Sequence, residues 1–135
     1  MATASNTGQD FSFPASGNLS TKQYYFVSLN SSSQIQVAGA NVSCLGVLQD
    51  KPKAANDGGQ VRCFGITKVL AGGVITVNDK VASDSSGKAV KATAGSVSAG
   101  TPEPLAGSYV QGIALSTVTT GDYVSVLLTH AGITN

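Results

Sequence analysis

The sequence predicts an all-β domain, a compact β-sandwich or small barrel built from short antiparallel strands. Two observations lead to this fold class. Short runs rich in Val, Ile, Tyr and Thr follow one another along the chain, and Gly, Asn, Asp and Ser residues separate them at short intervals. Apolar residues with the spacing of an amphipathic helix are hard to find. Many short strands with frequent turns are typical of sandwiches and small barrels.

The predicted strands begin with QYYFVSL, which is the most aromatic run, and end with DYVSVLLTH. Between the strands, NSSSQ, NDGG, LAGG, DSSG and TTGD supply the residues that tolerate a positive φ in a turn. In chain order, the predicted strands cover residues 23–29, 34–38, 43–49, 60–70, 73–77, 79–83, 87–93, 108–116 and 122–130.

Alternation along two of these strands predicts which side faces the core. In DYVSVLLTH, one face carries Val124, Val126 and Leu128 and is the more uniformly apolar. In QVRCFGI, the face with Val61 and Cys63 is the better candidate for the inner side. These five side chains are therefore expected in the core.

Tyr24, Tyr25 and Phe26 are consecutive, so at least one of them must leave the core face of its strand. An aromatic residue on the outer face is a candidate for a contact between subunits. A half-exposed tyrosine without such a role is the alternative.

Two stretches lie outside the predicted strands. Residues 1–18 are largely polar, with Phe11 and Phe13 alternating before Pro14, and such a segment cannot build a core by itself. A flexible N-terminal arm is therefore predicted. Residues 93–108 are rich in Gly, Pro, Ser and Ala and predict a long exposed loop.

The rest of the chain, residues 19–135, is predicted to form a single β-rich domain with an internal repeat. Residues 17–38 can be aligned with residues 73–92, because each contains a Ser-rich turn between two strands and ends in Ala. Residues 45–65 can likewise be aligned with 111–128. The expected halves are about 19–65 and 66–130, although chance similarity between hairpins is the alternative.

Composition and charge exclude several classes of protein. Charged residues make up 11% of the 135 residues, against a usual ~25%, and the net charge is +1, so no nucleic-acid surface is expected. Weak self-repulsion favours association with copies or partners. No run approaches 18 apolar residues, and the N-terminus lacks an apolar signal region, so neither a membrane span nor a secretory signal is expected.

Catalytic, metal and cofactor sites are not expected. A nucleophile needs a nearby base, and the single histidine, His130, has Asp122 and Asp10 as candidate partners for a triad that is not favoured. NDGG and SDSSGK resemble pieces of calcium loops but lack the repeated acidic ligands. Cys44 and Cys63 do not have metal-ligand spacing and are expected to be reduced and buried, unless their two strands are neighbours and allow a disulfide.

Several phrases in order resemble a known family. GVL and GGQVRCFG are followed by ITVNDKVASDSSGKAVKA, then by GIAL and TTGDYVSVLL. Over roughly residues 17–130 this order is similar to that of the capsid cement, or head-decoration, proteins of tailed bacteriophages. The segment TPEPLAGS is a departure, because it makes a longer loop than the compact pattern has.

The resemblance implies a non-enzymatic protein that binds the outside of the mature head shell and stabilises it against the internal pressure of DNA. It implies the major capsid protein as partner and self-association as a homotrimer, without nucleic acid, membrane or cofactor. The protein would be made in the host cytoplasm and end on the outer surface of the virion. The arm, through Phe11, Phe13 and Pro14, would add a strand to a sheet edge of the shell.

Two other functions stay open. One is a carbohydrate-binding or adhesive module of a fibre, tail or cell surface, although aromatic residues are only 6% and Trp is absent. The other is a subunit of a tail or shell that assembles by itself. The two structural roles differ in whether a preformed shell is required.

Overall fold

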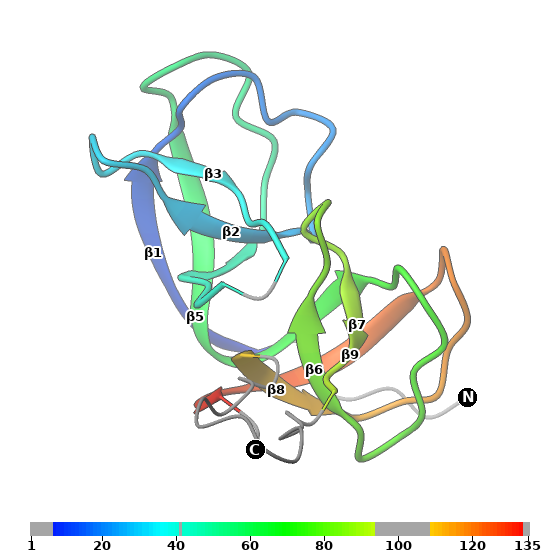
Figure 1. Ribbon diagram of the computed structural model, residues 1–135. Helices are drawn as coiled ribbons and strands as arrows, with labels where there is room; N and C mark the ends of the chain where they lie inside the picture. The colour runs from blue at the N-terminus through cyan, green and yellow to red at the C-terminus, as the bar shows by residue number, and fades with distance from the viewer. Residues whose placement is uncertain (1–6, 41, 94–108, 134–135) are drawn as a thin grey trace, which may run out of the picture.

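The computed structural model describes residues 7–40, 42–93 and 109–133, and over these ranges the chain forms one antiparallel sheet without helices (Figure 1). The sheet is strongly curled into a half-barrel, so the all-β prediction is confirmed. Its strands are β1 (Gly8–Pro14), β2 (Phe26–Leu29), β3 (Ile35–Val37), β4 (Gly46–Leu48), β5 (Gly58–Leu70), β6 (Lys80–Ser83), β7 (Ala89–Lys91), β8 (Tyr109–Ala114) and β9 (Tyr123–Ile133). In the part of the chain that the structure describes, no helix could cross a membrane.

Neighbouring strands follow the order β3-β2-β4-β5-β9-β8-β6-β7, and β1 pairs with β5 beside this path. The long strand β5 runs through both groups of strands in the molecule (Figure 1). Near its start, Val61 pairs with Phe11 of β1 on one side and with Leu48 of β4 on the other. Near its end it pairs with β9, as at Ile66 and Leu127. One strand therefore belongs to two groups of strands.

The backbone contacts of the first group recur in the second. The β2–β3 hairpin pairs Val27 with Val37, and the β6–β7 hairpin pairs Val81 with Lys91 at the same place. Each hairpin pairs through its first strand with a short strand, β4 or β8, which then pairs with β5 or β9. We call residues 7–64 the N-terminal half and residues 65–133 the C-terminal half, and we call residues with matching backbone contacts equivalent.

Positive φ angles support the same equivalence. Residues in the left-handed region are uncommon outside glycine, and they mark turns and bends. Here they fall at matching places of the two halves, in the pairs Tyr24 and Asn78, Ser33 and Gly87, Asn56 and Gly121, and Gly65 and His130. The halves therefore share their bends as well as their strand pairing.

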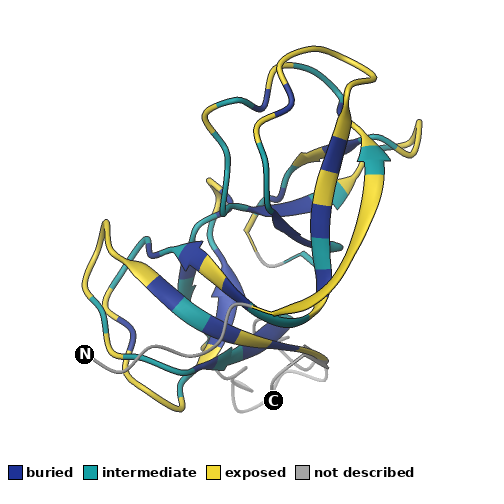
Figure 2. Cartoon of the chain, turned by 180° about the vertical axis from the view of Figure 1, so that it is seen from behind, coloured by how far each residue is buried: buried dark blue, intermediate teal, exposed yellow. Residues whose placement is uncertain are grey.

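Burial along the strands follows the predicted alternation (Figure 2). Val124 and Val126 are fully buried, whereas Tyr123 on the opposite face is 51% exposed. Val61 and Cys63 are buried in the same way, whereas Gln60 and Phe64 are exposed and Arg62 is partly buried. The inner faces predicted for both strands are confirmed.

Each half has its own hydrophobic core, and the two cores differ in composition. The N-terminal core contains only residues of its own half: Ala15, Leu19, Val27, Ile35, Leu48, Val61 and Cys63. The C-terminal core contains nine residues of its own half: Val69, Ala71, Ile75, Val81, Ala89, Ala114, Val124, Val126 and Leu128. It also contains four residues that the N-terminal half contributes, namely Phe26, Ala38, Cys44 and Val47. The N-terminal half therefore covers the C-terminal half, and among the described residues the C-terminal half contributes none to the N-terminal core in return.

The structure differs from the sequence prediction at two places. Residues 8–14 lie in the predicted flexible arm but form β1, which pairs with β5 along its whole length. The predicted strand at residues 73–77 is wrong: only Ile75 makes an isolated bridge, to Val118, while Val74 is 66% exposed. Most of the predicted loop at 93–108, and residues 1–6 of the arm, lie outside the described residues.

Candidate interaction surface

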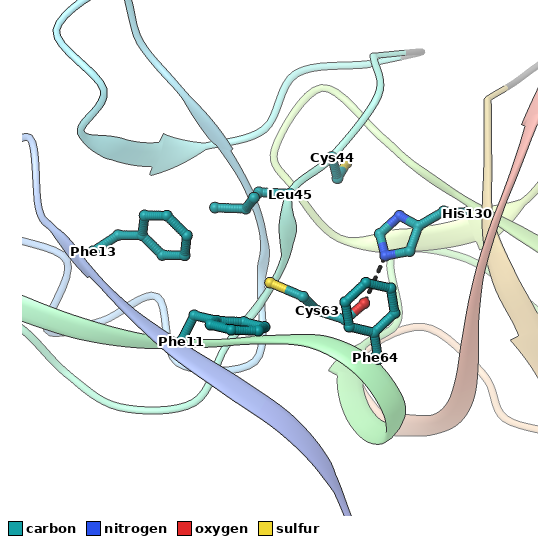
Figure 3. A pocket seen from close by; sticks show the side chains of 7 residues that line it. All are labelled: Phe11, Phe13, Cys44, Leu45, Cys63, Phe64 and His130. Atoms are coloured by element: carbon teal, nitrogen blue, oxygen red, sulfur yellow. Dashed lines mark hydrogen bonds between the residues drawn. The ribbon is translucent and has the colours of Figure 1, made fainter.

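An apolar groove of about 510 Å³ opens beside β1 in the N-terminal half (Figure 3). Its lining comes from four parts of the chain that are distant in sequence: β1, the segment before β4, β5 and β9. We call it the phenylalanine groove, and the side chains that line it are Phe11, Phe13, Cys44, Leu45, Cys63, Phe64 and His130.

Local backbone geometry explains how β1 and β5 both present side chains to this groove. Phe11 and Phe13 are two residues apart on β1, so they share one face. On β5, Cys63 and Phe64 are adjacent and would ordinarily face opposite sides. The pairing with β1 shifts register at this point, and Gly65 follows with a φ of 105°, so the strand bends there. The bend lets both neighbours line the groove.

The groove leaves large apolar side chains exposed to water. Phe11 is 43% exposed and Phe64 is 58% exposed. Full burial of a phenylalanine is worth about 1.5–3 kcal/mol, so covering both rings would be favourable. Single exposed apolar residues are ordinary, but a cluster around a hollow is typical of a binding surface.

His130 is held at one end of the groove by two contacts. Its Nε2 lies 2.7 Å from the carbonyl oxygen of Cys63, and its ring meets Phe64 edge-on at 6.0 Å between centroids (Figure 3). The two carboxylates considered for a triad have other partners. Asp122 accepts a hydrogen bond from the Thr119 hydroxyl, and Asp10 pairs with Arg62. The arrangement around His130 is therefore that of a structural contact.

The cysteines are buried and free, as expected. Burial raises the pKa of Cys44 to about 12, against a contribution from Ser83 that lowers it. Burial, and then the negative charge of Asp10, raise the pKa of Cys63. Both thiols are therefore protonated at neutral pH, and a protonated thiol is a poor nucleophile and a poor metal ligand.

The acidic residues of the turns accept backbone hydrogen bonds. Asp57 accepts from the amide of Ala54, and Asp79 accepts from that of Thr76. These are the turn roles that aspartate commonly has. Across the described residues, no three His, Cys, Asp or Glu side chains gather as they would around a metal ion.

The residues singled out from sequence fall in different places. Phe11 and Phe13 come together in the groove, whereas Pro14 is exposed at the end of β1. Phe26 is fully buried, so it offers no surface to another subunit. Tyr24 is half-buried, lies edge-on to the ring of Tyr123 at 5.6 Å, and sits beneath the Lys68 ammonium. A subunit contact at Tyr24 and Tyr25, and a capsid contact for the arm, both stay predictions.

Leu45, Phe64 and the position of His130 were not anticipated as part of a surface. One signal was available: Phe64 lies on the outward face of its predicted strand, where a large apolar residue is unusual. The other parts depend on contacts between distant segments, which alternation along one strand does not reveal.

No protein-family model and no curated protein sequence matches the chain. Among solved structures, the chain is similar to the head fiber gp8.5 N base in bacteriophage phi29, with a TM-score of 0.64. The match covers 94% of this chain and 98% of that chain, with 18% sequence identity. At this identity the likeness shows the fold alone: almost the whole chain is built like the base of a phage head fibre.

Proposed function

We propose that the chain is a structural protein of a bacteriophage head, attached to the outer surface of the shell. The observation that carries the proposal is the fold likeness to a head fibre base, which extends over nearly the full length of both chains. The order of phrases that resembles head-decoration proteins supports it independently. Catalysis is no part of the proposal.

The physical character of the molecule agrees with a binding role. The body is one continuous sheet with two cores, and an apolar groove on its described surface is lined in part by phenylalanine rings. A net charge of +1 gives little long-range repulsion between copies or from a neighbouring surface. Such a body gains affinity by adding contact area at many repeated sites.

In its finer form, the proposal is that the protein is a decoration, or cement, protein. It binds the major capsid protein on the mature shell, associates with itself as a homotrimer, and opposes the outward pressure of the packaged DNA. Three copies at one junction act together, so contacts that are weak singly become strong collectively.

The test is addition of the purified protein to shells from phage that lack its gene. We expect the protein to co-sediment with the shells, to occupy regular positions in electron micrographs, and to raise the temperature at which filled heads release DNA. Absence of binding to the shells would contradict the proposal. Assembly of the protein alone into tubes or shells would favour the self-assembling subunit, and specific signals on a glycan array would favour the adhesive module.

The role of the arm needs a variant that leaves the sheet intact. Because residues 8–14 form β1, deletion of residues 2–6 removes only the segment ahead of it. We expect this variant to lose most of its shell binding while its circular dichroism spectrum and unfolding temperature stay unchanged. The shell binding of the deletion variant is compared with that of Phe13→Ser, which alters the groove and keeps residues 2–6. Full shell binding by the deletion variant would rule out residues 2–6 as the part of the arm that binds the shell.

A second candidate is favoured by the description of the similar structure as a fibre base. In that role the protein would anchor a projecting fibre instead of reinforcing the shell. The same heads distinguish the two: a fibre base leaves the temperature of DNA release unchanged, and a decoration protein raises it.

A further inference from the structure

We infer that copies of this chain bind head to tail, with the C-terminal half of one copy covering the phenylalanine groove of the next. The inference adds a contact surface to the self-association that belongs to the proposed function. It is argued from the contact between the two halves within one chain, and it is tested without shells, so a failure of capsid binding would leave it standing.

Within one chain, side chains of the N-terminal half cover the inner face of the C-terminal half. Gln49 donates from Nε2 to the Thr67 hydroxyl oxygen at 2.8 Å. The amide side chain of Gln111 bridges two backbone groups of the segment before β4: it accepts from the Cys44 amide at 3.2 Å and donates to the Val42 carbonyl at 2.9 Å. Thr67 and Gln111 are buried as a result.

The equivalent inner face of the N-terminal half is the open groove. Thr67 pairs with Val126 as Phe11 pairs with Val61, so Thr67 and Phe11 are equivalent. Gln111 and Leu45 are equivalent because each precedes a glycine that pairs with the first half of a hairpin, at Gly112 and Gly46. Thr67 is 1% exposed, whereas Phe11 is 43% exposed. The same position is thus covered in one half and open in the other.

The surface that does the covering is buried in the N-terminal half and more exposed in the C-terminal half. In the N-terminal half it includes Phe26, Ala38 and Val47, which are all buried against the C-terminal half. By matching strand pairs and backbone hydrogen bonds, their equivalents in the C-terminal half are Lys80, Ala92 and Ile113. Lys80 is exposed, and Ala92 and Ile113 are only partly buried. Within the part of the chain that the structure describes, one covering surface and one inner face are therefore left over, at opposite halves.

One pair of positions on the two leftover surfaces is apolar on both sides. Gln49 and Leu115 are equivalent, because the amide of each donates at 2.7 Å to the neighbouring long strand, at Gln60 and Ser125. The polar pair of Gln49 with Thr67 inside the chain thus corresponds to an apolar pair between copies, Leu115 on Phe11.

A contact of this kind joins two different surfaces, so it repeats from copy to copy until a ring closes or a fibre grows. It continues an interface that the molecule already forms between its own halves. It is not a perfect copy of that interface. A Cβ atom at Gly87 would lie 2.6 Å from Val37 Cγ1, and the equivalent of Gly87 is Ser33, which carries one. The neighbouring copy therefore sits slightly farther away than the second half does.

The test uses the purified full chain in sedimentation velocity over a range of concentrations. Phe11→Thr and Leu115→Gln should each weaken self-association by at least about tenfold, the effect of losing roughly 1.4 kcal/mol. The double variant, which copies the Thr67 and Gln49 pair, should recover most of the loss. Val74→Thr is the matched control, since Val74 is 66% exposed and is not among the groove residues, and it should change nothing.

A cross-link tests the same contact without altering the apolar pair. Gly87 and Val37 touch within the chain, and their equivalents are Ser33 and Lys91. Cysteine is therefore introduced at both positions of one chain, as Ser33→Cys and Lys91→Cys. Both residues are exposed, and β3 and β7 lie at opposite ends of the strand order. A short bis-maleimide should join copies into dimers and larger species. A chain that is monomeric at every concentration, or cross-links only within single copies, would overturn the inference.

Discussion

The two halves of the molecule have the same strand pairing and the same bends but differ in what covers them. The C-terminal core gains Phe26, Ala38, Cys44 and Val47 from the other half, whereas the N-terminal core has only its own residues. The difference shows that backbone geometry and packing are separable: one arrangement of strands supports a filled core in one half and an open groove in the other.

The largest expected effect comes from removing the main covering side chain. Phe26→Ala should lower the free energy of unfolding by about 3–5 kcal/mol, because it leaves a cavity in the C-terminal core. The equivalent change in the other half, Lys80→Ala, should stay within about 0.5 kcal/mol, because Lys80 is exposed. Urea unfolding followed by circular dichroism measures both. Equal losses of unfolding free energy in the two variants would contradict the finding that only the N-terminal covering surface is packed against the other half.

A smaller effect, similar in the two halves, is expected at a pair of equivalent glycines. A Cβ atom at Gly46 would lie 2.2 Å from the Arg62 carbonyl oxygen, and one at Gly112 would lie 2.3 Å from that of Leu127. Alanine at either position must push two paired strands apart, at a cost of about 3 kcal/mol. Gly39→Ala is the control, since nothing lies within 4 Å of its Cβ position. The unfolding temperatures of the three variants measure these effects. A drop in only one of the two paired-glycine variants would contradict the equivalence of Gly46 and Gly112.

The smallest effect concerns the two hairpin turns. Asn30 Oδ1 accepts from the amides of Ser32 and Gln34, and Asp84 Oδ1 makes the same two contacts in its own turn. Asn30→Ala and Asp84→Ala should each lower stability by about 1–2 kcal/mol. Asp84→Asn should be neutral within about 0.5 kcal/mol at pH 7, because Asn30 shows that an amide oxygen suffices. A full loss in Asp84→Asn would show that the charge is required.

Alternation made the fold class and the inner faces predictable, because apolar residues two apart must share one side of a strand. Val124 and Val126, and Val61 with Cys63, were placed correctly for this reason. The same rule gave a wrong strand at 73–77, where Val, Ile and Thr suggest a strand but the two valines are exposed. Composition alone did not distinguish an extended turn from a paired strand.

Strand β1 and the groove were beyond a local reading of the sequence. Residues 8–14 contain polar residues and only two apolar ones, and their partner in the sheet begins at Gly58, far along the chain. The groove needs that long-range pairing, the bend at Gly65 and the return of β9 to place His130 beside Cys63. Alternating Phe11 and Phe13 hinted at a strand, but nothing nearby in sequence indicated what it would pair with.

The shared strand β5 has a consequence for how the molecule melts. Because its start completes the N-terminal half and its end completes the C-terminal half, neither half can come apart without exposing an edge of the other. Despite its two cores, the chain should denature in one cooperative step, with calorimetric and van't Hoff enthalpies that agree.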